Sequence, residues 1–164
     1  MTAESVRNMA YHPAIRNSSD KLEVRKIRLV NGVYEKGRRF VDEDYEFLRT
    51  GQIVTGDIDG DGDLDAAVIL YYMNGDRKST QLAVVLDIKG NPVHVASREF
   101  LEGTEIMGLK LDRPMVRNNR TGQLERKGMV SVEVSNETCC NGQGKTVSYL
   151  FENQSLVGQD PFRR

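Results

Sequence analysis

The sequence has only two cysteines, and they are adjacent, at Cys139 and Cys140. Neighbouring cysteines cannot link distant parts of a chain, so a framework of disulfides does not hold this protein together. The side chains of adjacent residues normally diverge, which leaves two alternatives open. The pair either forms a strained vicinal disulfide, as in some redox switches, or remains as two separate thiols.

The sequence also lacks an excess of charge of either sign. It has 23 Lys and Arg residues against 24 Asp and Glu residues, which gives a net charge of −1. A chain with so little net charge has no overall field to attract DNA or RNA, so we expect no nucleic-acid partner. No apolar run approaches the ~20 residues of a membrane-spanning helix, so we expect no transmembrane segment. Residues 1–10 lack the pattern of a signal peptide.

Catalytic signatures are missing as well. The sequence contains no nucleophile elbow, no H-E-x-x-H, no P-loop and no G-x-G-x-x-G. The histidines are His12 and His94, and no spacing favours either one as the partner of a nucleophile. His94 lies in a strand pattern among apolar neighbours, where a structural histidine is the more common case. The sequence therefore predicts that the protein is not an enzyme.

What the sequence does contain is a series of short apolar and β-branched runs separated by turn residues. Asn31-Gly32 is a preferred hairpin turn, and a second clear turn lies at residues 89–92. The run at residues 66–72 is apolar throughout, as in a strand that is buried on both faces. Strands are expected at residues 22–30, 33–34, 46–55, 66–72, 82–86, 93–96, 105–111, 129–134, 147–151 and 155–157.

These strands recur about every ten residues without helices between them. Only residues 2–10 and 42–48 have a helical period, and both segments are short. We therefore expect a mainly β fold, with an antiparallel meander, a sandwich or a partly open barrel and a short N-terminal helix. An α+β fold is the alternative. A chain of 164 residues fits one domain, residues 1–164.

Residues 113–127 are polar and contain five basic side chains. This segment could bind an anion, but a solvated, mobile loop between strands is the more common explanation. No aromatic residue is interleaved with the charges, which counts against a stacking platform for single-stranded nucleic acid. We therefore predict a mobile loop at residues 113–127.

Five aspartates lie within nine residues, at Asp57, Asp59, Asp61, Asp63 and Asp65. Carboxylates held this close repel one another, and a bound cation relieves the repulsion. Their spacing matches a calcium loop, in which side chains at positions one, three and five, the carbonyl at position seven and an oxygen at position nine bind the ion. The sequence therefore predicts a Ca²⁺ site with these five residues as ligands, Asp63 through its backbone carbonyl.

The residues between the aspartates support this register. Gly62 stands at position six, where the chain must turn sharply, and Ile58 can point into the core. Position twelve is Val68 rather than the glutamate of an EF-hand, and a strand follows instead of a helix, so the loop is not an EF-hand. An ordinary Asp- and Gly-rich turn without an ion is the alternative. Magnesium fits less well, because it prefers a tight octahedron with several waters.

The pattern D-x-D-x-D-G-x-x-D resembles the calcium loops of FG-GAP and integrin-type repeats, which lie between two strands. Over about half of the chain, residues 56–70, 82–86, 90–97 and the Cys139-Cys140 pair resemble a largely uncharacterised family of small bacterial exported proteins and lipoproteins. Departures from that family occur at residues 76–79 and at Asn141, and they put only loop details in doubt. The resemblance implies a periplasmic or extracellular protein, whose signal peptide would be cleaved off, and implies no activity.

Together these features predict a calcium-binding domain of the cell envelope or a secreted protein, with a structural or binding role. Its partner would be an unidentified protein or envelope component. Two alternatives from other classes stay open. One is a calcium-assisted hydrolase, and the other is a thiol redox module that uses the cysteine pair.

Overall fold

The fold of this protein is built almost entirely from strands. A computed structural model describes residues 1–16, 22–75, 77–117, 121–135 and 144–159. Strands make up 62% and helix 4%, the sheets are antiparallel, and none of those described closes into a barrel. The expected mainly β fold with a short N-terminal helix is therefore confirmed.

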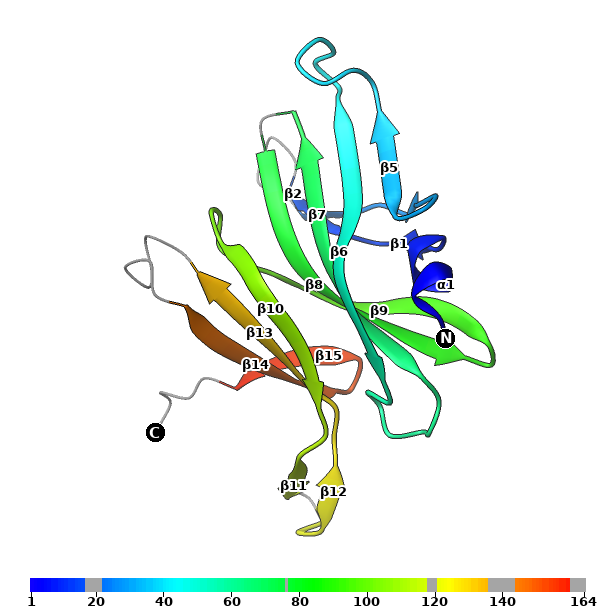
Figure 1. The fold of residues 1–164 in the computed structure, drawn as a ribbon, viewed down its shortest axis with the longest axis vertical. Coiled ribbons are helices and arrows are strands. Elements are labelled where there is room, and N and C mark those ends of the chain that lie inside the picture. The colour runs from blue at the N-terminus through cyan, green and yellow to red at the C-terminus, as the bar shows by residue number, and fades with distance from the viewer. Residues whose placement is uncertain (17–21, 76, 118–120, 136–143, 160–164) are drawn as a thin grey trace.

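A five-stranded meander forms the central layer (Figure 1). Each strand is hydrogen-bonded to the strand that follows it in the sequence, because short turns connect antiparallel neighbours. In the turn between the last two strands, Lys89 and Gly90 have φ angles of 56° and 82°, as the favoured two-residue hairpin turn requires. The strands are β5 (Val33–Lys36), β6 (Glu46–Gly56), β7 (Asp65–Asn74), β8 (Arg77–Ile88) and β9 (Asn91–Glu99).

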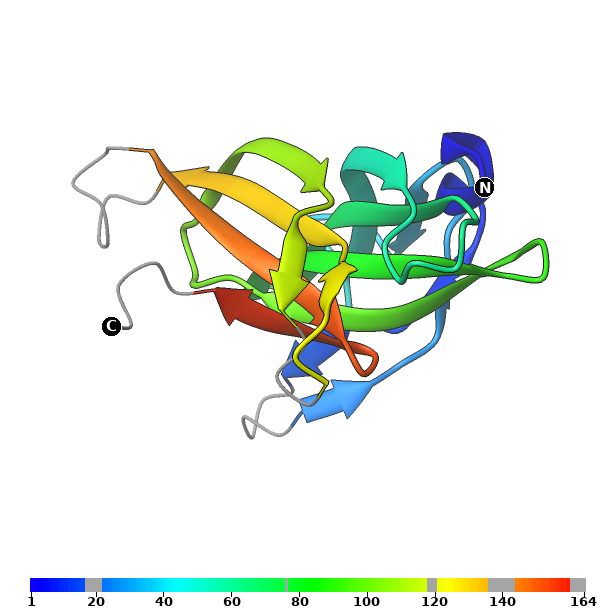
Figure 2. The same cartoon turned by 90° about the horizontal axis from the view of Figure 1, so that it is seen from below.

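A second, four-stranded sheet packs against one face of the meander. Its strand order is β10-β13-β14-β15. The strands are β10 (Glu105–Asp112), β13 (Met129–Ser135), β14 (Lys145–Glu152) and β15 (Ser155–Gln159). Both sheets are seen from below in Figure 2.

The predicted loop at residues 113–127 contains a short hairpin between β10 and β13. Its strands are β11 (Met115–Arg117) and β12 (Leu124–Arg126), and Val116 pairs with Glu125. The hairpin projects from the lower end of the molecule in Figure 1. Sequence reasoning missed these strands because they are only three residues long. The mobility of this segment stays a prediction.

The N-terminal segment covers the other face of the meander. Helix α1 (Ala3–Arg7) begins at Thr2, whose hydroxyl accepts a hydrogen bond from the backbone N–H of Ser5 at 3.1 Å, and this satisfies a free donor of the first turn. The suggested helix at residues 42–48 is wrong, because β6 begins at Glu46. No helix in the described part of the chain is long and apolar enough to cross a membrane. Two small pairs complete this layer: β1 (Ala10–Tyr11) with β4 (Ile27–Arg28), and β2 (Ala14–Arg16) with β3 (Leu22–Val24).

Strand β7 contributes to two cores, one on each face of the meander. Val68 and Leu70 pack with Tyr11 and other residues of the N-terminal segment, whereas Ile69 packs with residues of the four-stranded sheet such as Val132. All five side chains are fully buried. Successive side chains of a strand point to opposite faces, so an unbroken apolar run is what a strand covered on both sides requires. The prediction of a buried central strand is confirmed.

Candidate metal centre

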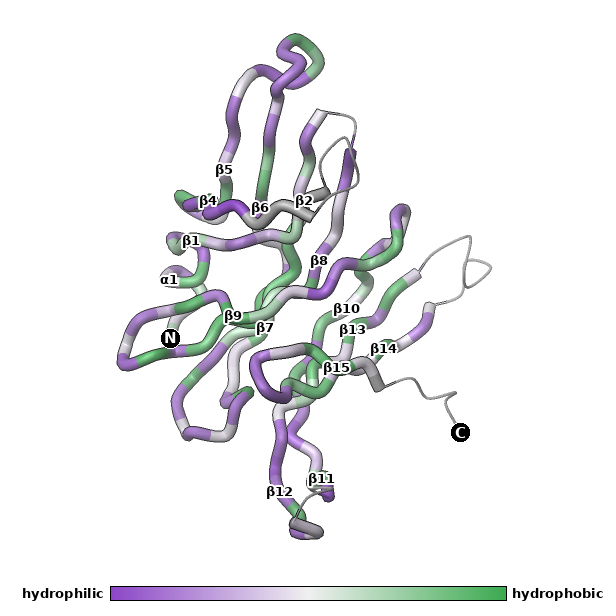
Figure 3. Tube along the Cα trace, turned by 180° about the vertical axis from the view of Figure 1, so that it is seen from behind, coloured by the Kyte–Doolittle hydropathy of each residue, from purple (hydrophilic) through white to green (hydrophobic). Residues whose placement is uncertain are grey.

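The Asp-rich segment is the connection between β6 and β7. Strand β6 ends at Gly56 and β7 begins at Asp65, and these two residues pair in register. The connection, residues 57–64, lies toward the lower end of the molecule in Figure 1 and is mostly hydrophilic in Figure 3. We call residues 57–65 the Asp loop. The sequence predicted a loop between two strands, and the structure places it there.

The structure brings three of the five aspartates together. One carboxylate oxygen from each of Asp57, Asp59 and Asp61 lies within 4.8 Å of the corresponding oxygens of the other two. Oxygens that bind one calcium ion at about 2.4 Å are at most about 4.8 Å apart. The three side chains can therefore contact a single ion, with backbone oxygens or water as further ligands.

Hydrogen bonds between residues close together in the sequence hold these side chains in place. The backbone N–H of Gly60 donates to Asp57 Oδ1 at 2.7 Å, that of Asp61 to Asp59 Oδ1 at 3.2 Å, and that of Asp63 to Asp61 Oδ1 at 2.9 Å. The cluster is therefore arranged by the local backbone. Gly62 has a φ of 97°, which strongly favours glycine, and a Cβ there would meet no atom within 4 Å. Its role is conformational, as position six of a calcium loop requires.

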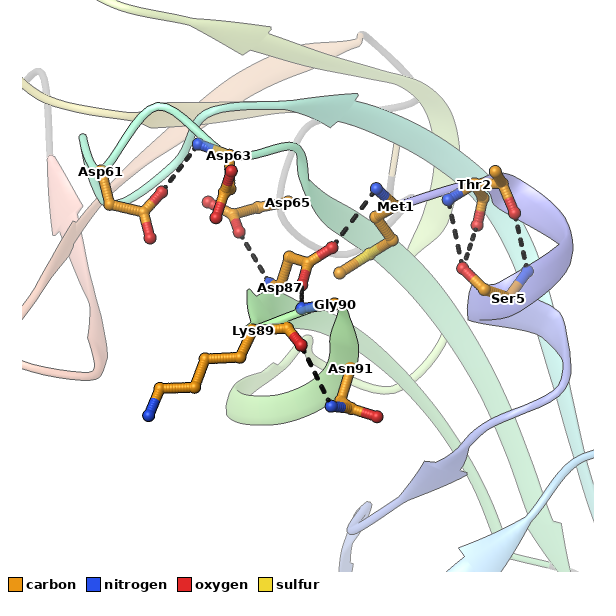
Figure 4. Close-up of polar contacts among 10 residues, drawn as sticks. All are labelled: Met1, Thr2, Ser5, Asp61, Asp63, Asp65, Asp87, Lys89, Gly90 and Asn91. Carbon is orange, nitrogen blue, oxygen red and sulfur yellow. Dashed lines mark hydrogen bonds and ion pairs between the residues drawn. The ribbon is translucent and has the colours of Figure 1, made fainter.

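Asp65 lies outside the cluster of three carboxylates, and its role as a ligand stays a prediction. Its side chain is 1% exposed, and its oxygens accept three backbone hydrogen bonds, from Ile58 at 2.8 Å, Asp59 at 3.4 Å and Asp87 at 2.9 Å. The bond to Asp87, at the end of β8, is drawn in Figure 4. Asp65 therefore fastens the Asp loop to its surroundings. Neither Asp65 nor the exposed Asp63 belongs to the three-carboxylate cluster.

The loop is also anchored from the second sheet. Ile58 is 1% exposed and packs in the core between the sheets. Its carbonyl accepts a hydrogen bond from the backbone N–H of Gly128 at 3.1 Å. A Cβ on Gly128 would lie only 2.7 Å from the Cα of Ile58, so this close approach needs glycine. The loop is held at both its start and its end.

Positive charge near the loop is scarce. Arg113 Nη1 lies 2.9 Å from Asp57 Oδ2, and the amino group of Met1 lies 3.4 Å from Asp87 Oδ2 (Figure 4). In the part of the chain that the structure describes, no basic group forms an ion pair with the carboxylates of Asp59, Asp61, Asp63 or Asp65. Most of the negative charge of the loop therefore has no counterion among the described residues.

This imbalance is reflected in two pKa shifts. Partial desolvation raises the pKa of the Asp59 carboxyl, and repulsion from the carboxylates of Asp65, Asp61 and Asp57 raises it further, against a backbone hydrogen bond that lowers it. Burial raises the pKa of Asp65 as well, although its three backbone hydrogen bonds act in the opposite direction. The charged forms of Asp59 and Asp65 are thus disfavoured by burial and by repulsion from neighbouring carboxylates.

The histidines lie elsewhere. The backbone N–H of His12 donates to His94 Nδ1 at 2.9 Å, and His94 Nε2 lies 3.0 Å from the carbonyl oxygen of Ala96 and 2.8 Å from Ser97 Oγ. Both ring nitrogens of His94 are therefore used in structural contacts. Cys139 and Cys140 lie outside the described residues, so their redox state stays a prediction.

Sequence reasoning missed three residues that shape the loop, namely Asp87, Arg113 and Gly128. Each contacts the Asp loop from at least 22 positions away in the sequence. The sequence around the loop therefore does not predict these contacts.

Comparisons with known proteins add no assignment. No protein-family model matches the chain, and neither a curated protein nor a solved structure is significantly similar to it. The resemblance to small exported bacterial proteins therefore stays a prediction. Any proposal about function has to rest on the geometry of the chain itself.

Proposed function

We propose that this protein is a calcium-braced domain with a structural or binding role, and that it is not an enzyme. A single Ca²⁺ binds in the Asp loop through Asp57, Asp59 and Asp61, with the backbone carbonyl of Asp63 as a further ligand. The ion stabilises the β6–β7 turn and, through Ile58, the edge of the core between the two sheets. Asp65 holds the loop in the binding conformation.

The observation that carries this proposal is the cluster of carboxylate oxygens within 4.8 Å of one another. Oxygen ligands at this spacing suit a hard cation that accepts six to eight oxygens at 2.3–2.6 Å. Magnesium suits the loop less well, because it demands an octahedron at 2.0–2.1 Å. Bound calcium would also offset the charge that Arg113 leaves uncompensated.

We further propose that the domain works outside the cytoplasm, in the periplasm or the extracellular medium. Only three side chains converge on the ion, so we expect an affinity typical of extracellular modules, with a Kd on the order of 10⁻⁴ M. A site of this affinity is filled only where calcium is near millimolar. The partner would be a protein or another component of the envelope.

A thermal unfolding experiment in calcium and in chelator tests the proposal. An ion that binds only the folded state stabilises it by RT ln(1 + [L]/Kd). With 1 mM calcium and a Kd on the order of 10⁻⁴ M, the stabilisation is about 1.4 kcal/mol, and the melting temperature rises by a few degrees. Titration calorimetry should give one ion per chain, and magnesium at the same concentration should have a smaller effect.

Two variants of the same loop provide a matched comparison. Asp61→Ala removes one oxygen ligand and one charge from the cluster and should abolish most of the calcium-dependent stabilisation. Asp63→Ala makes the same change in charge two residues away and should leave most of it, because Asp63 contributes only its carbonyl. Identical melting curves in calcium and chelator for the unmodified protein would refute the proposal.

A further inference from the structure

A cleft opens between the two sheets at the end of β7 that is remote from the Asp loop. Its volume is about 860 Å³, within the roughly 300–1,000 Å³ that small-molecule sites occupy. The walls come from the start of β8, from the end of β9 with the connection to β10, and from β13 and β14. In Figure 1 these elements lie at the upper left, where β8 and β13 diverge.

The described residues that line the cleft carry an excess of positive charge. Four of their side chains are basic and two are acidic, in a chain whose net charge is −1. Positive charge gathered in a concave site attracts anions more strongly than the same charges spread over a surface. The basic residues are Arg77, Lys78, Arg98 and Lys145, and the acidic residues are Glu99 and Glu102.

Beside these charges the cleft offers an apolar wall. Phe100 and Tyr149 contact each other edge to face, with ring centroids 6.4 Å apart, and Val147 lies in the same lining. Leu101, also in the lining, is 74% exposed. An apolar body placed here would remove Leu101 and the partly exposed Phe100 from water, which favours binding.

Hydrogen bonds hold this wall in place before any ligand binds. The N–H of Phe100 donates to the carbonyl of Thr80 at 2.9 Å, and that of Thr104 donates to the carbonyl of Leu101 at 3.1 Å. The Ser79 hydroxyl donates to Glu99 Oε1 at 2.7 Å. A site that is already ordered spares a ligand the free energy of ordering it.

We propose that this cleft binds a small amphipathic anion, with its apolar body against Phe100 and Tyr149 and its charged group among the basic side chains. A carboxylate on either an alkyl chain or an aromatic ring has this chemistry. The site is separate from the Asp loop and does not depend on calcium.

Fluorescence titration with 8-anilinonaphthalene-1-sulfonate, an aromatic anion, tests the proposal in calcium-free buffer. We expect saturable binding of one probe per chain, and at least fivefold weaker binding of N-phenyl-1-naphthylamine, which lacks the sulfonate. Decanoate and 4-phenylbutyrate then compete with the bound probe. The stronger competitor shows whether an alkyl or an aromatic acid is the better ligand, and displacement by either one supports the proposal.

Paired variants locate the site. Lys78→Glu should weaken probe binding at least fivefold, whereas Lys110→Glu, the same reversal on the exposed side of β10, should leave it unchanged. Leu101→Ser should weaken binding about threefold, and Leu124→Ser, at an exposed position of β12, should not. The proposal is overturned by an absence of saturable binding below millimolar probe, by equal losses in the members of each pair, or by equal affinity for the neutral naphthylamine.

Discussion

Two buried carboxylates lie at opposite ends of the β6–β7 pair, and their charges are offset in different ways. Glu46 faces Asn74 at one end, and Asp65 faces Gly56 at the other; the two acidic residues are 2% and 1% exposed. Glu46 Oε1 lies 3.0 Å from Arg25 Nη1 and accepts a hydrogen bond from the Tyr72 hydroxyl at 2.7 Å. Among the described residues, Asp65 accepts hydrogen bonds only from backbone N–H groups.

The difference separates a self-contained site from one that, under the proposed function, an ion would complete. Burying a charge is costly unless it is paired and hydrogen-bonded. Glu46 has its counterion within the chain, and burial together with this carboxylate raises the pKa of Tyr72, which keeps its hydroxyl protonated as a donor. Asp65 is hydrogen-bonded, forms no ion pair with the described residues, and is repelled by the nearby carboxylate of Asp61. The deficit at this end is what calcium would supply.

The largest effect is expected when the buried carboxylate of the Asp loop is removed. Asp65→Ala leaves three backbone N–H groups without their acceptor, and each such loss costs about 1–3 kcal/mol. We expect the free energy of unfolding to fall by about 3–5 kcal/mol and the calcium effect to disappear, as urea denaturation with and without calcium would show.

The exposed neighbour Asp63 is the control for this variant. Asp63→Ala should change the free energy of unfolding by no more than about 0.5 kcal/mol, as most exposed substitutions do. A loss below about 1 kcal/mol for Asp65→Ala would mean that the loop does not depend on this carboxylate.

His94 sharpens the comparison, because it is a buried polar group that needs no counterion as long as it stays neutral. Burial, with a smaller contribution from the nearby His12, lowers its pKa to about 4, although a hydrogen bond to the Ala96 carbonyl acts in the opposite direction. Between pH 6.5 and about 4 the unfolded chain therefore binds a proton that the folded chain does not, so stability falls as the pH falls. The loss over this range is roughly 3 kcal/mol, measurable as the free energy of unfolding at several pH values.

A variant that cannot titrate isolates this contribution. His94→Phe should remove the slope between pH 6.5 and 4, whereas His12→Gln, at an exposed position, should keep it. Equal slopes in the unmodified protein and in His94→Phe would show that His94 is not the group responsible.

A smaller effect is expected at the self-contained end. In Glu46→Gln the amide can still bond the hydroxyls of Tyr72 and Tyr34, and Arg25, with 47% of its side chain exposed, can return to water. We expect a loss of about 1–2 kcal/mol and an unchanged calcium effect in thermal unfolding. A change in the calcium-dependent stabilisation of Glu46→Gln would show that the Glu46 end and the Asp-loop end are energetically coupled. The two ends would then not be independent sites.

The difference between the two ends also explains what the sequence could and could not predict. The positions of Asp57, Asp59 and Asp61 follow from the local spacing, and the burial of Ile58 follows from its place between them, so the loop and its three converging carboxylates were predictable. The partners of Asp65 and Asp57 were not, because Asp87 and Arg113 reach the loop only through the pairing of strands distant in the sequence. The same holds for Arg25 beside Glu46, which belongs to a different segment.

The same distinction between local and long-range contacts applies to the fold. Hairpins such as that at Lys89-Gly90 are local and were predicted from turn residues. The covering of both faces of β7 was predicted from one apolar run. The strand order of the second sheet, in which β10 pairs with β13 across the β11–β12 hairpin, depends on contacts that no local pattern specifies.

The smallest effect is expected for Arg113, the basic residue at the Asp-loop end. Its guanidinium is the one basic group among the described residues that pairs with an aspartate of the Asp loop, and its side chain is 36% exposed. It relieves part of the repulsion without calcium, but it also opposes the approach of a cation. A unit charge a few ångströms from an ion in a water-exposed site contributes about 1 kcal/mol or less, so Arg113→Gln should tighten calcium binding about threefold while lowering stability in chelator slightly. Arg117→Gln, with the same change of charge in β11, should leave the affinity unchanged. Calorimetric titration measures both, and weaker calcium binding in Arg113→Gln would show that this arginine supports the site rather than competing with the ion.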